Sequence, residues 1–350
     1  MSKTLVARLD SVGDVLLTGP AVRSITEAGD DVTFLASSIG APAAELLPGV
    51  REIIRFDAPW VLTSQPPVHA GEVERLLGEV GAIRPDRAVI FTSFHQSPLP
   101  LALLLRLAGV PHIGATSIDY PGSLLDVRHH VSPQHHEVDR NLSLVRACGF
   151  PALRDRRLLV DLSGRRRPSQ LDELPQSYLA VHPGASSPAR TAAPSQWAEI
   201  VWALSAAGHH VLLTGSDRET EPVVRGAGTA ANVVALGGDS SLADLAWALS
   251  GAGAVITGNT GPAHLAAAVG TPVVSLYPPT VPIWRWRPWG VRHAVLGDQR
   301  IGCRGCRVLE CPRVVEGRQP CLAAVHPYEV VWMAEAVQQS AVDLRLEVAS

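Results

Sequence analysis

Cysteine is scarce in this sequence, with five among 350 residues, and four of them lie between Cys303 and Cys321. Small secreted domains held together by disulfides use many more cysteines, so that class of protein is excluded. An excess of positive charge is also missing, because the formal net charge is −3. Nucleic-acid-binding proteins normally carry a basic face, and we therefore expect no nucleic-acid partner.

Long apolar runs are absent as well. The most apolar stretch, LPLALLLRLAGV at 99–110, contains Arg106 and is shorter than the roughly 20 residues of a membrane-spanning helix. The first residues, MSKTLVARLDSVGDVLL, do not form a signal peptide, because Asp10 and Asp14 interrupt the apolar region. We expect a cytoplasmic protein, and contact with the inner face of a membrane stays open.

The length of the chain favours two domains over a single core. Short β-rich runs such as TLVARL (4–9) alternate with helical patterns, and the alternation restarts at YLAVHPG (178–184). This pattern predicts α/β domains with parallel sheets. The charged, proline-containing segment 154–177 interrupts it. We predict an N-terminal domain at 1–165 and a C-terminal domain, with the cysteine-containing loop and a C-terminal helix, at 176–350.

Three loops that follow predicted strands carry candidate functional residues. The first is RLDSVGDVLLTGP (8–20), in which Asp14 falls in the first turn of the next helix. An Asp at that position can simply satisfy free N–H groups and favour the helix dipole. It can also be a carboxylate held at a cleft as a general base. The residues alone leave both interpretations open.

The second loop is VHPGASSPARTAAP (181–194). It offers a backbone opened by Gly184, the hydroxyls of Ser186 and Ser187, and the forked donors of Arg190. Backbone amides, hydroxyls and one arginine are typical of a phosphate-binding turn. An ordinary Ser/Pro turn with a surface arginine is the other interpretation.

The third loop lies in ITGNTGPAHLAAAVGTPVVSLYPPT (256–280). Asn259, Thr260, Gly261 and His264 stand at the start of a predicted helix. A helix N-terminus after a glycine binds anions, because its free N–H groups and its dipole point at the ligand. Capping alone would explain Asn259 and Thr260 but not His264. Two such turns in one domain suggest a substrate that carries a diphosphate.

Together the three loops resemble glycosyltransferase family 9, the heptosyltransferase-like family, in their order and spacing. The resemblance extends from near the N-terminus to about residue 330. It implies a GT-B fold, in which two Rossmann-like domains with parallel sheets face a cleft. It also implies an inverting glycosyltransferase that needs no metal or other cofactor for catalysis. The implied donor is a nucleotide-diphosphate sugar similar to ADP-heptose, and the implied acceptor is a glycan or glycolipid.

The same resemblance implies roles for individual residues. Asp14 matches the catalytic carboxylate, and Glu219 matches an acidic residue associated with the nucleotide ribose. The other positions that match donor-binding residues are Ser186, Ser187, Arg190, Asn259, Thr260, Gly261 and His264. Many family members have Asp where this chain has Asn259, a difference that leaves the identity of the sugar open.

The four clustered cysteines, Cys303, Cys306, Cys311 and Cys321, begin with the C-x-x-C spacing of thiolate zinc sites. A structural zinc, a disulfide pair and free thiols are all open interpretations. A metal held by four thiolates would have no open ligand position, so we expect it to be structural rather than catalytic.

Two other functions stay open from the sequence. A nucleotide-sugar epimerase of the same architecture would need acid/base groups on both faces of the sugar, and only Asp14 is well placed. A non-catalytic nucleotide-sugar-binding protein is favoured only by Asn259. The acceptor is not indicated, but the N-terminal loops 58–72 and 92–100 are expected to contact it.

Overall fold

The computed structural model describes residues 1–62, 66–93, 95–132, 134–230 and 232–339. The chain forms two compact units, Met1–Asp161 and Leu162–Ser350. The division falls inside the charged segment 154–177, where the alternation of strands and helices is interrupted. Each unit is an α/β domain with one parallel sheet, as the sequence pattern predicts.

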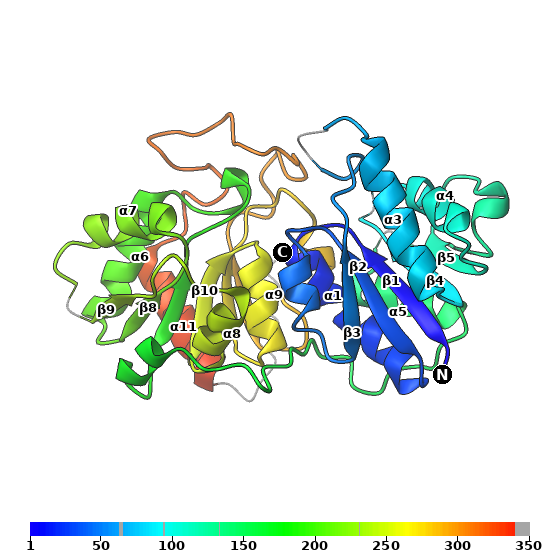
Figure 1. Cartoon of the computed structure of the whole chain (residues 1–350). Coiled ribbons are helices and arrows are strands. Elements are labelled where there is room, and N and C mark those ends of the chain that lie inside the picture. Colours follow the sequence, from blue (N-terminus) through cyan, green and yellow to red (C-terminus); the bar gives the residue numbers. More distant parts are fainter. Residues whose placement is uncertain (63–65, 94, 133, 231, 340–350) are drawn as a thin grey trace. The chain divides into compact units, whose positions relative to one another are not determined.

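The first unit is built on six parallel strands in the order β3-β2-β1-β4-β5-β6 (Figure 1). Its strands are β1 (Lys3–Arg8), β2 (Asp31–Ala36), β3 (Val50–Arg55), β4 (Arg87–Phe91), β5 (Ile113–Thr116) and β6 (Val127–His129). Its helices are α1 (Val12–Glu27), α2 (Ala41–Ala44), α3 (Ala70–Ile83), α4 (Leu99–Leu107), the 3₁₀ turn η1 (Gly122–Leu124) and α5 (Glu137–Ala147).

The central strand of this sheet is apolar because both of its faces are covered. Only Lys3 of β1 is exposed. Leu5 packs in a core with Leu76 of α3 and Leu101 of α4. Val6, which points to the opposite face, is also buried, and the helices α1 and α5 pack against each other and against the sheet. Near-continuous apolar strands are typical of parallel sheets that lie between two layers of helices.

The second unit repeats this plan, with six parallel strands in the order β12-β11-β10-β7-β8-β9. Its strands are β7 (Leu179–His182), β8 (Val211–Leu213), β9 (Val233–Ala235), β10 (Ala254–Gly258), β11 (Val273–Leu276) and β12 (His293–Leu296). Its helices are η2 (Ser169–Glu173), η3 (Pro188–Arg190), α6 (Pro194–Ala206), α7 (Asp217–Ala227), α8 (Leu242–Ser250), α9 (Gly261–Ala268), α10 (Ile283–Trp286) and α11 (Pro327–Gln339).

Packing and capping in the second unit follow the sequence closely. Trp197 of α6, Val223 of α7 and Val330 of α11 share one core with the sheet. The helix α8 begins with a capping box, as its sequence spacing predicts. Ser241 Oγ accepts a hydrogen bond from the Asp244 N–H at 3.2 Å, and the Asp244 carboxylate accepts one from the Ser241 N–H at 2.9 Å.

Both sheets reverse their strand order at an equivalent place. In the first unit the chain turns from the β1–β2–β3 side to β4, and in the second it turns from the β7–β8–β9 side to β10. Loops that leave the carboxyl ends of two strands at such a reversal diverge and leave a crevice for a ligand. The three candidate loops follow β1, β7 and β10, so each lies at a reversal point.

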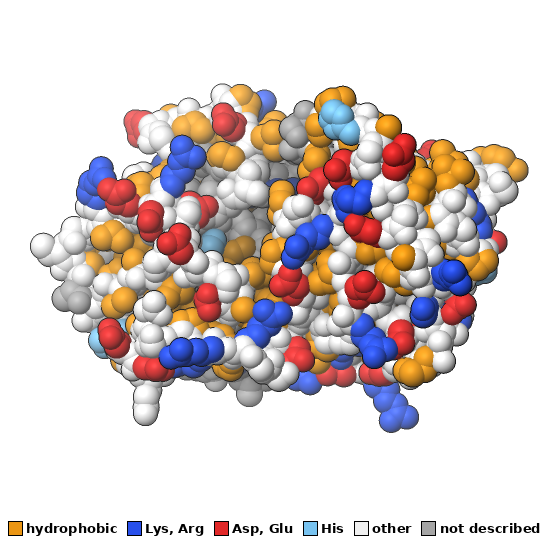
Figure 2. Space-filling model, viewed as in Figure 1, with side chains coloured by type: hydrophobic (Ala, Val, Ile, Leu, Met, Phe, Trp, Pro, Cys, Tyr) orange, Lys and Arg blue, Asp and Glu red, His pale blue; other side chains and the backbone are white. Residues whose placement is uncertain are grey.

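The surface carries charges of both signs. On the face shown in Figure 2, Lys and Arg side chains are interspersed with Asp and Glu. Within the described part of the chain, no helix is both long and apolar enough to cross a membrane.

Candidate active site

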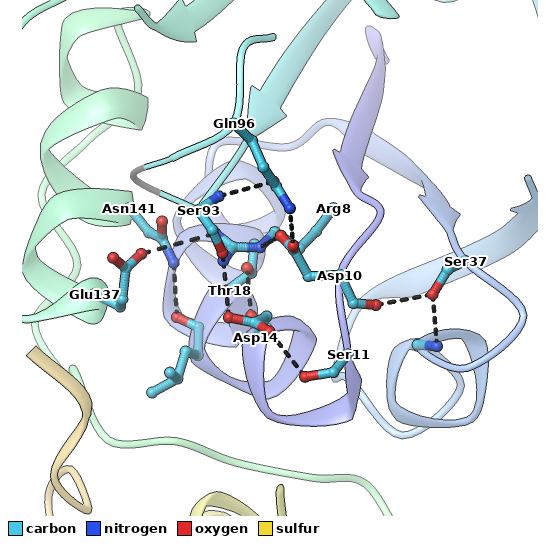
Figure 3. Close-up of polar contacts among 12 residues, drawn as sticks. Arg8, Asp10, Ser11, Asp14, Thr18, Ser37, Ser93, Gln96, Glu137 and Asn141 are labelled. Atoms are coloured by element: carbon cyan, nitrogen blue, oxygen red, sulfur yellow. Dashed lines mark hydrogen bonds and ion pairs between the residues drawn. The ribbon is translucent and has the colours of Figure 1, made fainter. Parts of the chain in front are cut away.

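The reversal point of the first unit holds Asp14 in a network of side chains (Figure 3). Asp14 lies in the first turn of α1, after the N-cap Ser11. Its Oδ1 accepts a hydrogen bond from Arg8 Nη2 at 2.9 Å, and its Oδ2 accepts one from Ser11 Oγ at 2.8 Å. Both of these donors are side chains rather than backbone N–H groups of the helix. The contacts therefore orient the carboxylate and go beyond a helix cap.

Arg8 is the centre of this network. Its side chain is fully buried, and its Nε lies 2.6 Å from Asp10 Oδ2. Its Nη2 also donates to Ser93 Oγ at 3.0 Å, and its Nη1 lies 3.8 Å from Glu137 Oε2. Burial acts to lower the pKa of Arg8, but the charges of Asp10, Asp14 and Glu137 outweigh burial and raise that pKa above its ordinary value.

Two further residues secure the carboxylates around Arg8. Gln96 donates from Nε2 to Asp10 Oδ1 at 2.5 Å, and Arg140 Nη1 lies 3.4 Å from Glu137 Oε1. Burial raises the pKa of Asp10 above its ordinary value, and Arg8 opposes that effect. Gln96 belongs to a loop that we expected to contact an acceptor, but its side chain supports Asp10. Residues 63–65 and 94 of the expected acceptor loops lie outside the described residues.

The second loop follows β7 in the second unit, and its backbone at Gly184 lies close to the side chain of Glu219. A Cβ atom on Gly184 would lie 2.3 Å from Glu219 Oε1, so the backbone and this carboxylate are in direct contact. Glu219 also caps α7, because its Oε2 accepts hydrogen bonds from Ser216 N and Ser216 Oγ, both at 2.8 Å. Burial lowers the pKa of the neighbouring His182 to about 4, and Glu219 opposes that effect.

The hydroxyls and the arginine of this loop differ in exposure. Ser186 is exposed, whereas Ser187 is buried and donates from Oγ to the Leu309 carbonyl at 2.8 Å. Arg190 is half-buried at the end of the 3₁₀ turn η3. Ser187 keeps its oxygen lone pairs but uses its hydrogen within the protein. Ser186 and Arg190 therefore offer the more available donors to an anion.

The third loop joins the second directly. The Asn259 N–H donates to the Arg190 carbonyl at 3.1 Å, and a Cβ atom on Gly258 would lie 2.6 Å from the same oxygen. The helix α9 starts at Gly261 with Thr260 as its N-cap, and the Thr260 side chain makes no capping hydrogen bond. Asn259, Thr260 and His264 are buried. The structure thus brings together the two loops that were predicted to share one diphosphate.

Comparison with known proteins identifies the family of this chain. The model of "Glycosyltransferase family 9 (heptosyltransferase)" matches residues 95–314 of the chain. The chain belongs to glycosyltransferase family 9. The resemblance seen in the three loops is therefore confirmed, and the matched region contains both loops of the second unit.

Individual relatives extend this picture. The chain is 30% identical over 161 residues to lipopolysaccharide heptosyltransferase 3 of Escherichia coli. This alignment covers 43% of this chain and 47% of the relative. The alignments span about half the length of the first curated relatives.

Solved structures show that the fold is shared over nearly the whole chain. E. coli ADP-heptose lps heptosyltransferase II superposes with a TM-score of 0.75 at 20% identity, covering 97% of this chain and 98% of that one. E. coli heptosyltransferase WaaC with ADP gives 0.68 at 22% identity, covering 96% and 99%. The predicted GT-B fold of two parallel-sheet domains is confirmed.

Several residues of the site were not predicted from the sequence. In the first unit these are Arg8, Asp10, Ser93 and Glu137, all of which surround Asp14 or its partner. In the second unit it is Tyr277, which follows β11 and is buried. Its hydroxyl donates to the Pro282 carbonyl at 3.3 Å. Burial raises the pKa of Tyr277 above its ordinary value, while Arg190 and Asn259 act in the opposite direction.

The cysteine segment of this family 9 chain lies after β12. Cys306 is exposed, and Cys303, Cys311 and Cys321 are half-buried free thiols. Burial raises the pKa of Cys321 to about 11, and Cys311, Cys303 and Cys306 act in the same direction. Nowhere in the described ranges are three His, Cys, Asp or Glu side chains arranged as metal ligands. The metal site stays a prediction.

Proposed function

We propose that this family 9 protein transfers a sugar from a nucleotide-diphosphate donor to a hydroxyl of a glycan or glycolipid. The observation that supports this most strongly is the joining of the two anion-binding loops through the Asn259–Arg190 hydrogen bond at one reversal point. Arg190, Ser186 and the N-terminus of α9 together offer a charge, a hydroxyl and the positive end of a helix dipole. This combination suits two adjacent phosphates better than one.

We propose Asp14 as the general base that accepts the proton of the acceptor hydroxyl. The hydroxyl oxygen then forms a bond to the anomeric carbon of the sugar, and the bond from that carbon to the diphosphate oxygen breaks. The diphosphate leaves with the electron pair, stabilised by donors that are already in place. A single displacement of this kind inverts the anomeric configuration. Fixed donors would supply the stabilisation that a metal ion supplies in other enzymes, and any metal held by the four cysteines would be structural.

A nucleotide sugar similar to ADP-heptose is the proposed donor. Support comes from the relatives, whose names include ADP-heptose and heptosyl transfer to lipopolysaccharide. Asn259 stands close to Arg190 without the negative charge that many family members carry there. We therefore propose that the sugar contact of this chain differs from that of a member with Asp. A glycolipid acceptor would bring the protein to the inner face of a membrane as a peripheral protein.

A panel of nucleotide sugars, each incubated with and without candidate acceptors, tests the proposal. Release of nucleoside diphosphate that depends on the acceptor, with a product of inverted configuration, would support it. Inversion at a sugar carbon without any acceptor would show an epimerase. Tight binding without turnover across the panel would show a binding protein. A chelator should leave the transfer rate unchanged.

A further inference from the structure

Asp14 is held by an arginine in an unusual position. Arg8 is the last residue of β1, the strand from which the chain reverses direction in the first sheet. Its backbone is paired with Ala36 of β2 on one side and Phe91 of β4 on the other. The base of this side chain is thus fixed by two neighbouring strands, and its guanidinium is fully buried at the edge where a ligand is expected.

The surroundings of Arg8 exceed what neutralising a buried charge requires. One carboxylate would suffice, but three face it. Asp10 lies 2.6 Å from Nε, Asp14 lies 2.9 Å from Nη2, and Glu137 lies 3.8 Å from Nη1. Among the three carboxylates, Asp14 is the most exposed, with 15% of its side chain accessible against 9% for Asp10 and 1% for Glu137.

The partners of Arg8 fall into two groups, those inside the unit and the one nearest its surface. Asp10, Glu137 and Ser93 hold Arg8 from within the unit, and Figure 3 shows them arranged around the guanidinium. Asp14 is the outermost partner and is held at Oδ1 by Arg8 and at Oδ2 by Ser11. We propose that Arg8 is a positioning residue, which keeps the Asp14 carboxylate aimed at the acceptor hydroxyl, and that Asp10 and Glu137 keep Arg8 in place. This inference rests on the proposed role of Asp14 as the general base.

Lysine is the informative replacement for Arg8. Arg8→Lys keeps the positive charge among the carboxylates but has a single donor group, which cannot reach Asp10, Asp14 and Ser93 in the geometry of a guanidinium. A misplaced catalytic group costs up to about a hundredfold in rate. We expect Arg8→Lys to lower kcat by about tenfold to a hundredfold. The donor KM should stay within about twofold, since the donor loops belong to the second unit.

A double-mutant cycle separates positioning from general damage to the fold. kcat, both KM values and the melting temperature are measured for the full-length chain, Arg8→Lys, Asp14→Asn and the double variant. If Arg8 acts through Asp14, Arg8→Lys will not lower the residual kcat of Asp14→Asn further. Arg106→Lys is the matched control, because Arg106 pairs with Asp126 elsewhere in the unit, and it should leave kcat unchanged.

Each outcome decides the inference. An equal loss from Arg8→Lys in both backgrounds, or normal kcat in Arg8→Lys, overturns the role of Arg8. If Arg8→Lys does not fold, Ser93→Ala replaces it in the same cycle, and a severalfold loss of kcat that disappears with Asp14→Asn is then expected. A wild-type chain that transfers no sugar from any donor overturns the proposed function, whereas an active chain indifferent to these variants overturns only the positioning role.

Discussion

The two reversal points have the same topology and opposite chemistry. In the first unit the charged side chains of the site pair with one another, and Arg8 is surrounded by Asp10, Asp14 and Glu137. In the second unit the site consists of hydroxyls, a helix N-terminus and Arg190, whose side chain has no ion pair among the residues described. The first arrangement suits holding one catalytic group still, and the second suits receiving an anion. The same sheet topology thus carries two chemically different sets of residues in its loops.

The largest effect on turnover is expected at Asp14, in the site of the first unit. Asp14→Asn keeps the shape of the side chain but removes its ability to accept a proton. We expect kcat to fall by about a hundredfold or more, the order typical for loss of a general base, with little change in donor affinity. Steady-state kinetics and donor titration provide the measurement. Unchanged turnover would reduce Asp14 to a structural residue of α1.

The second largest effect is expected on nucleotide affinity, at Arg190 in the second unit. Arg190→Ala deletes a charge-assisted contact of roughly 1.5–3 kcal/mol, so a nucleoside diphosphate should bind about ten- to a hundredfold more weakly. Arg287→Ala is a suitable control, because Arg287 is exposed and lies outside the three loops. Calorimetric titration compares the variants. Equal losses in both would show that Arg190 makes no specific contact with the phosphates.

The sequence indicated more of the candidate residues in the second unit than in the first. The residues of the second and third loops are close together within each motif, so local spacing was enough to single them out, and their role in binding stays a prediction. Arg8 and Glu137 are 129 positions apart, and only the folded sheet brings them together. Short strands also escaped prediction, because β6 has only three residues, all half-buried, and shows no clear alternation. Local patterns carry little information about such long-range or short elements.

A smaller effect is expected where Gly184 meets Glu219. Gly184→Ala should displace the Glu219 carboxylate from the cap of α7 and destabilise the protein by about 1–2 kcal/mol, the usual cost of a lost cap. Glu219→Ala should cost about the same, and the double variant no more than either, because both remove one contact. Gly78→Ala in α3 is the control, with open space around its new methyl group. Urea unfolding compares these four variants with the wild-type chain, and additive losses would contradict the shared contact.

The smallest effect is expected in the cysteine segment, which follows β12 and contacts the second loop through the hydrogen bond from Ser187 Oγ to the Leu309 carbonyl. If Cys303, Cys306, Cys311 and Cys321 gather around zinc, metal analysis should find about one equivalent, and a chelator should lower the melting temperature without changing kcat. Replacement of Cys306, the exposed member, by Ser should have the same effect as the chelator. Metal-free protein with an unchanged melting temperature would rule out the site.

We propose that the second unit binds a diphosphate through its two joined loops. Calorimetric titration of the wild-type chain with a nucleoside diphosphate and with the matching monophosphate tests it most directly. We predict that the diphosphate binds at least about tenfold more tightly, because the second phosphate gains charge-assisted hydrogen bonds. Equal affinity for the two nucleotides would contradict the diphosphate site and remove the main support for a nucleotide-sugar enzyme.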